Sequence, residues 1–424
     1  MAEIIDRNGD EVVLQVRVKL RGSLLEMEEG IQQAVNKVGM AATGEALSRF
    51  DTTGGKIQVG NVRLSTKGKV KKIYETPYGA VEVQRHVYQS CEGGGTYCPL
   101  DDKARIITHS TPLLAKIISS KYARGGALDV VEDLKVSNGR TVVRSFVQNL
   151  VEMVGSIAQA TEEDWSYEIP EPEDDVATVG LSLDGTCIGM QVGGWREAMT
   201  GTLSLYNEDG ERQHTIYLGA SPEYGKAKFL KRLEDEITKL KRIYPHANYV
   251  GIADGAKVNW EFLEKHTQHQ VLDFYHATEY LAKVAKAIDS PTEHARKAWL
   301  KDACHRLKHD KGSATALLEE MKALPENGLS SDALAGLQSA ITYFSNQKHR
   351  MNYQQYAALS FPIGSGVTEA ACKTLVKQRL CQSGMRWKEK GASIVLALRA
   401  LVFTKGRFEQ FWNRIDQTGL AGII

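Results

Sequence analysis

The sequence predicts an α/β protein with a sheet-containing core, which is interrupted by an all-helical segment and preceded by an α+β region. Three patterns predict this class. Strand-like apolar runs alternate with amphipathic helices between residues 177 and 277, the pattern is purely helical from 278 to 350, and period-2 alternation with hairpin turns precedes residue 110.

The length indicates several domains, because 424 residues are too many for one compact core. The expected segments are an α+β region at 1–110, a pair of helices at 111–161, an acidic linker at 162–176, the first part of the core at 177–277, a helical insertion at 278–350, and the second part of the core with C-terminal helices at 351–424.

The composition is that of a soluble globular protein, with 42% hydrophobic and 25% charged residues. No apolar run is long enough to span a bilayer, and no secretory signal is visible, so we expect a cytoplasmic protein without a membrane partner. The six cysteines are scattered, as in a reducing compartment. The net charge of +1 does not by itself indicate nucleic acid, but a neutral total can hide basic surfaces that are balanced by acidic ones.

Local patterns predict the elements of the first 110 residues. We expect a half-buried strand at 11–20, an amphipathic helix at 24–49 and β-hairpins at 56–88. Cys91 and Cys98 then flank a glycine-rich turn, which suggests a zinc loop. Their six-residue gap differs from a Cys-x-x-Cys knuckle and no second pair follows, so a loop without zinc is the competing interpretation.

The helical segment at 111–161 contains two helices joined by a short turn. A helix at 127–134, a turn at 137–139 and a second helix at 140–154 form the helix-turn-helix pattern. The second helix would present Arg140, Arg144 and Gln148 on one face, and these residue types contact phosphates and base edges. A plain helical hairpin remains the alternative.

After the acidic linker, the order of elements is that of an RNase H-like sheet. Three strands, a helix, a strand, a helix and a final strand or strand end are expected at 179–190, 202–206, 215–220, 226–244, 248–254, 258–266 and 270–276. The helical insertion follows. A helix that begins in a Gly-Ser-Gly loop then returns the chain to the sheet, and one further amphipathic helix is expected at 391–413.

Three acids stand at positions where such elements meet. Asp184 and Asp254 end apolar strand-like runs, and Glu369 lies in the first turn of the Gly-Ser-Gly helix. Lys373 and Lys377 follow Glu369 at four-residue spacing, so all three share one face. A carboxylate beside cations is suited to bind a metal ion and a polyanion at one site. The alternative interpretation is a solvated helix with ordinary charge pairs.

Several motifs together resemble the bacterial insertion-sequence DDE transposases of the ISKra type, within the Mutator-like group. The resemblance extends over 76–412 and is carried by Leu183-Asp184-Gly185-Thr186, Ala253-Asp254-Gly255-Ala256, Asp273-Phe274-Tyr275-His276, Gly364-Ser365-Gly366-Val367-Thr368-Glu369 and Ser383-Gly384-Met385-Arg386-Trp387. It implies a DNA transposase in the bacterial cytoplasm, associated with the nucleoid. Such an enzyme binds the terminal repeats of its element and acts on double-stranded DNA as a homodimer or higher oligomer.

The resemblance also implies roles for individual residues. Asp184, Asp254 and Glu369 would hold two Mg²⁺ ions, with Mn²⁺ as a substitute, and Asp184 would bridge them. Asp273 and His276 would support the site, or form a structural hydrogen-bonded pair beneath it. DNA contacts are expected from Arg140, Arg144, Gln148, Lys373, Lys377, Arg379, Arg386 and Trp299, the last as a base-stacking residue or as a core residue. A non-catalytic DNA-binding protein or a simple nuclease on the same fold is the alternative function.

Overall fold

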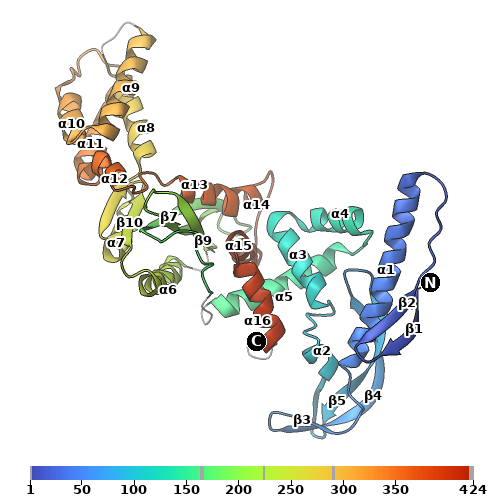
Figure 1. Ribbon diagram of the computed structural model, residues 1–424. Helices are drawn as coiled ribbons and strands as arrows, with labels where there is room; N and C mark the ends of the chain where they lie inside the picture. Colours follow the sequence, from blue (N-terminus) through green and yellow to red (C-terminus); the bar gives the residue numbers. More distant parts are fainter. Residues whose placement is uncertain (1, 163–166, 223–224, 289–291, 420–424) are drawn as a thin grey trace. The chain divides into compact units, whose positions relative to one another are not determined.

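The computed structural model describes residues 2–162, 167–222, 225–288 and 292–419 (Figure 1). The chain divides into two compact units. One contains Met1–Glu168 with Ala397–Val402 and Gly406–Ile424, and the other contains Ile169–Leu396 with Phe403–Lys405. Among the described helices, none combines the length and the apolar character needed to cross a membrane.

The first unit begins with a β-hairpin and a long helix. Strands β1 (Glu3–Asn8) and β2 (Glu11–Gln15) pair antiparallel, so the strand predicted at 11–20 ends earlier than expected. Helix α1 (Leu24–Arg49) has the predicted bounds, because Ser23 and Glu26 form a capping box at its first turn.

The predicted hairpins form a four-stranded sheet in the order β3-β4-β5-β6. Its strands are β3 (Ile57–Val59), β4 (Val62–Glu75), β5 (Ala80–Ser90) and β6 (Gly93–Tyr97). The Thr76 side chain closes the turn between β4 and β5, because its hydroxyl accepts the Gly79 N–H at 3.1 Å. Tyr74 and Tyr88 are fully buried and anchor the inner face of this sheet.

The helices that follow are α2 (Pro99–Lys103), α3 (Pro112–Arg124), α4 (Ala127–Asn138) and α5 (Arg144–Glu162). The helix predicted from residue 140 begins instead at Arg144. Gly139 adopts a left-handed conformation (φ +61°), and its N–H bonds back to the Lys135 oxygen at 3.0 Å, which ends α4 in an αL motif.

The second unit is built on a mixed five-stranded sheet in the order β11-β10-β7-β8-β9. Strands β7 (Thr178–Gly189), β8 (Trp195–Tyr206) and β9 (Arg212–Ala220) are antiparallel neighbours, whereas β10 (Asn248–Ala253) runs parallel to both β7 and β11 (His269–Leu272). Helices α6 (Lys226–Ile243) and α7 (Lys257–His266) contribute Phe229, Leu233 and Leu263 to the buried core of this sheet. The unit is therefore a mixed α/β structure.

The described residues of the predicted insertion form helices joined by turns and loops, without a strand. It contains α8 (Phe274–Ala285), α9 (Glu293–His309), α10 (Ser313–Ala323), α11 (Ser331–Gln347) and the 3₁₀ turn η2 (Lys348–Arg350), and α12 (Tyr353–Ala358) follows. Figure 1 shows these helices grouped together on the side of the sheet where β10 is labelled. Their apolar residues, such as Leu307, Leu337 and Phe344, continue the core of the sheet.

The C-terminal part differs from the prediction at one point. Helix α13 (Gly366–Ala371) continues through a π-helical turn (η3, Cys372–Lys377) into α14 (Gln378–Leu380). The single helix predicted at 391–413 is wrong, because the chain forms α15 (Glu389–Phe403) and α16 (Arg407–Thr418). Gly406 separates them with φ +86°, a conformation that glycine adopts without strain.

Candidate active site

The three predicted acids line one small pocket of the second unit. Asp184 lies within β7, Asp254 directly follows β10, and Glu369 lies in the first turn of α13. Because β7 and β10 are parallel neighbours, with Ile252 opposite Ser182, the first two acids reach the same part of the sheet. The pocket is lined by Ser182, Leu183, Asp184, Ala253, Asp254, His276, Ser365, Thr368 and Glu369.

Asp184 is half-buried and is held by two neighbours. Its Oδ1 accepts the Gly185 N–H at 2.7 Å, and its Oδ2 lies 3.4 Å from the Sγ of Cys372 in the π-helical turn. Burial raises the pKa of the Cys372 thiol to about 11, so this thiol is neutral at pH 7 and donates toward the carboxylate. Cys372 is not among the predicted site residues. In the sequence, its place on the buried face of the Glu369 helix is the one feature that could have indicated it.

Asp254 lies on a turn whose backbone is hydrogen-bonded by side chains of α11, a helix of the insertion. The backbone oxygen of Asp254 accepts the Tyr343 hydroxyl at 2.6 Å, and Gln347 donates to the Gly255 oxygen at 3.3 Å. The Tyr343 ring is stacked on Tyr280 of α8, with centroids 3.8 Å apart, which holds the hydroxyl in place. Among the described residues, the side chain of Asp254 accepts one loose bond, from the Ala256 N–H at 3.2 Å, so its carboxylate retains lone pairs for a ligand.

Asp273 is fully buried and organises the loop that carries Glu369. As the N-cap of α8, its Oδ1 accepts the His276 N–H at 2.7 Å. Its Oδ2 accepts the Ser365 hydroxyl at 2.6 Å and also the Ser365 N–H. The same hydroxyl lies 3.0 Å from Oε1 of Glu369. Asp273 therefore ties the start of α8 to the Gly-Ser-Gly loop, and residues 273–276 begin a helix rather than end a strand.

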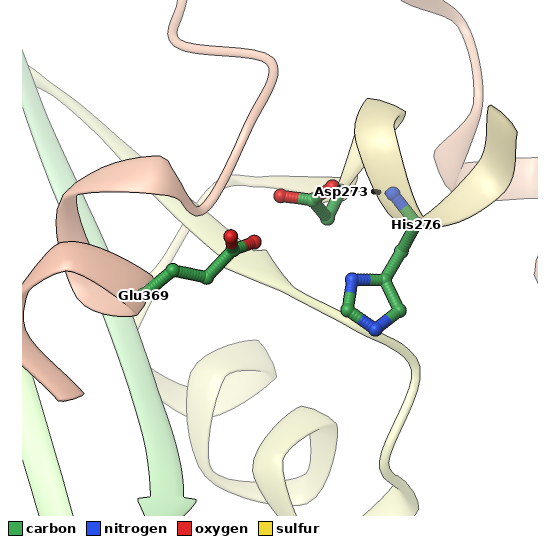
Figure 2. Close-up of side chains that lie close together, drawn as sticks. All are labelled: Asp273, His276 and Glu369. Atoms are coloured by element: carbon green, nitrogen blue, oxygen red, sulfur yellow. Dashed lines mark hydrogen bonds between the residues drawn. The ribbon is translucent and has the colours of Figure 1, made fainter. Parts of the chain in front are cut away.

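Asp273, His276 and Glu369 also form the one close group of potential metal ligands among the described residues, with ligand atoms all within 4.8 Å of one another. Figure 2 shows Glu369 extending from its helix toward the other two side chains. Protein donors already occupy both oxygens of Asp273, so we assign it a structural role in this group. His276 and Glu369 line the pocket with Asp184 and Asp254 and are the members open to a ligand.

The predicted DNA-contacting residues divide by exposure. Lys373, Lys377 and Arg386 are exposed. Arg379 is only 2% exposed and lies over the Trp387 ring at 5.2 Å, so the surface position predicted for it is wrong. Its place on the inner side of the helix, beside buried Leu375 and Leu380, explains the burial.

The DNA-contacting residues predicted in the first unit also differ in their exposure. Arg140 precedes α5 rather than lying on it, and it is buried in an ion pair with Glu75, so its predicted place on a recognition helix is wrong. Arg144 is exposed at the start of α5, and Gln148 is half-buried. In the insertion, Trp299 is partly buried and packs against the hydrophobic core.

The residues of the suggested zinc loop, Cys91 and Cys98, and the nearby His86 lie in different environments. Cys98 is buried, and burial raises the pKa of its thiol, whereas Cys91 is exposed. His86 directs Nδ1 to the Asp51 carboxylate at 2.9 Å. Neither cysteine belongs to a close group of three ligand residues in the part of the chain that the structure describes.

No protein-family model matches this sequence, and a search of curated proteins finds no significant match.

Proposed function

We propose that the protein is a DDE transposase that cleaves DNA at the ends of its insertion sequence and joins the ends to a target. One observation carries the proposal: Asp184, Asp254 and Glu369 are far apart in the sequence but line one pocket beside the sheet. The strand order, with three antiparallel strands followed by two parallel ones, supports an RNase H-like core, and the helices between β11 and α13 support an insertion at that point.

The donor atoms in the pocket fit hard divalent cations. Mg²⁺ prefers carboxylate oxygens and retains several waters, so three acids suffice for two ions. Asp184 would contact both ions, and Asp254 and Glu369 one each. When bound, such ions activate an attacking oxygen and neutralise charge on the leaving oxygen.

The chain's own residues would position the DNA and the acids. Ser365 and Asp273 orient the Glu369 helix, and the exposed cations Lys373 and Lys377 are placed to contact phosphates beside it. In the first unit, α4 and α5 are proposed as a DNA-reading pair, with Arg144 at the exposed start of α5. The partners of this proposal are duplex DNA and further copies of the chain.

The first test is metal dependence. Mg²⁺ or Mn²⁺ should support nicking of DNA that carries the element's ends, while Ca²⁺ should support binding without turnover, because Ca²⁺ tolerates looser coordination. Nicking is measured on end-labelled DNA, with a chelator as the control. Efficient cleavage in Ca²⁺ alone, or in the chelator, would contradict the proposed chemistry.

A second test concerns the hydroxyl that holds the Asp254 turn. Tyr343→Phe removes its bond to the Asp254 oxygen but keeps the stacked ring, so nicking should slow by about tenfold to a hundredfold, as for other groups that orient metal ligands. The melting temperature should change little, because one such bond contributes about 0.5–1.5 kcal/mol. Tyr280→Phe, which alters the other ring of the same stack, is the control and should nick at the wild-type rate. Equal rates for all three proteins would remove Tyr343 from the site.

A further inference from the structure

The hairpin that joins β7 to β8 exposes two large apolar side chains at its tip. Val192 is 86% exposed and Trp195 is 62% exposed. A tryptophan ring with this exposure is uncommon on a folded protein and marks a contact site for a ligand or partner when other features agree.

The tip is held in place at its base. Met190 donates its N–H to the Gly194 oxygen at 2.8 Å, which closes the hairpin. Gln191 donates to the Trp387 oxygen at 2.8 Å, and Trp387 donates its N–H back to Gly189 at 2.9 Å. The hairpin is therefore joined by backbone bonds to the segment that follows the Glu369 helix, and Trp195 is presented on an ordered support.

One cation lies against the Trp195 ring, and others are exposed on the same two segments of the chain. The Arg386 guanidinium lies over the Trp195 ring, 5.2 Å from its centroid. We call residues 190–197 and 385–390 the hairpin platform. Its charged residues are four exposed cations and two exposed acids, namely Arg196, Arg386, Lys388, Lys390, Glu197 and Glu389. A guanidinium against an exposed aromatic ring, on segments that expose more cations than acids, favours a polyanion with flat rings over an apolar protein surface.

The platform also lies on the same strands as the candidate active site. Asp184 pairs with Thr200 and Gly189 pairs with Trp195, so the two pairs are five residue steps apart on β7. At roughly 3.3 Å per residue, Trp195 is about 17 Å along the strand from Asp184. Because side chains alternate between the two faces of a strand, this odd spacing places the Trp195 ring on the face of the sheet opposite to the Asp184 carboxylate.

We propose that the hairpin platform binds an unpaired base of single-stranded or frayed DNA, which stacks on Trp195 while Arg386 contacts the adjoining phosphate. Arg386 covers one side of the ring, so the exposed remainder can take the base. The choice of DNA as partner rests on the proposed function. The site itself rests on the exposure of Trp195, its support and its charges.

The test compares full-length variants by fluorescence anisotropy with a labelled oligothymidine and with a blunt duplex, in Ca²⁺ so that no turnover occurs. Trp195→Ala should weaken oligothymidine binding by roughly 5- to 150-fold, the equivalent of about 1–3 kcal/mol for one stacked base, and weaken duplex binding much less. Trp195→Phe keeps a stacking ring and should stay within a few-fold of wild type. Leu359→Ala, which removes an exposed apolar side chain elsewhere in the same unit, should bind both DNAs as wild type does.

Equal oligothymidine affinities for wild type and Trp195→Ala would overturn the inference. If light scattering then shows that Trp195→Ala dissociates an oligomer, the ring belongs to a contact between copies of the chain. A parallel nicking assay separates the two proposals. Nicking with unchanged oligothymidine affinity in Trp195→Ala would refute the platform alone, whereas lost affinity without any nicking by wild type would refute the transposase and leave the platform.

Discussion

Asp184→Asn, Asp254→Asn and Glu369→Gln should each slow Mg²⁺-dependent nicking by at least about a hundredfold. Changes to groups that only orient metal ligands lower metal affinity or activity by about 10–100-fold. Loss of a ligand itself should therefore lower the nicking rate by at least the upper end of that range. Affinity for duplex DNA should remain near wild type, because each change removes a negative charge and no positive one. Single-turnover nicking and anisotropy in a chelator measure the two effects separately.

Glu208→Gln is the matched control for these variants. Glu208 is an exposed acid in the turn between β8 and β9, and it does not line the pocket. The Glu208→Gln variant should nick at the wild-type rate. A wild-type rate in Asp184→Asn, or an equal loss in Glu208→Gln, would show that the pocket acids are not the ligands.

Asp273→Ala should lower the stability of the second unit by about 1.5–5 kcal/mol. Loss of a helix N-cap costs about 0.5–2 kcal/mol. Buried donors of Ser365 left without a partner cost roughly 1–3 kcal/mol more. Nicking should fall as well, because Ser365 no longer fixes the loop that carries Glu369. Thermal unfolding followed by circular dichroism measures the first effect.

Ser330→Ala provides the comparison for Asp273→Ala. Ser330 is an exposed N-cap of α11, whose hydroxyl accepts the Ala333 N–H at 3.3 Å, so its loss removes only a cap. The melting temperature should fall clearly less than in Asp273→Ala, and nicking should be unchanged. Equal destabilisation by the two changes would mean that the Asp273–Ser365 contacts contribute nothing beyond capping.

Elements with strong local signals could be predicted from the sequence. Helix α1 has a capping box at Ser23 and Glu26, and the turn after β4 has Thr76 and Gly79, so adjacent residues determine both. The three acids could be singled out because each stands where an apolar strand or a glycine-opened helix meets a loop.

Features that depend on distant contacts could not be predicted. Arg140 has the spacing of a recognition-helix residue, but Glu75, 65 positions earlier, draws it into a buried pair. Tyr343 reaches Asp254 across 89 positions, and no local pattern indicates that contact. The apolar spacing of α15 and α16 fits one helix, and the break follows from Gly406 and from Thr404, whose hydroxyl accepts the Tyr217 N–H of β9 at 3.0 Å.

The position of bound metal tests the central claim most directly. Crystals grown with Mn²⁺ should give two anomalous peaks roughly 3.5–4 Å apart, with Asp184 between them and Asp254 and Glu369 at either side. A single peak held by Asp273, His276 and Glu369, with none at Asp184, would contradict the account, because the ion would then occupy the close group and not the proposed catalytic acids.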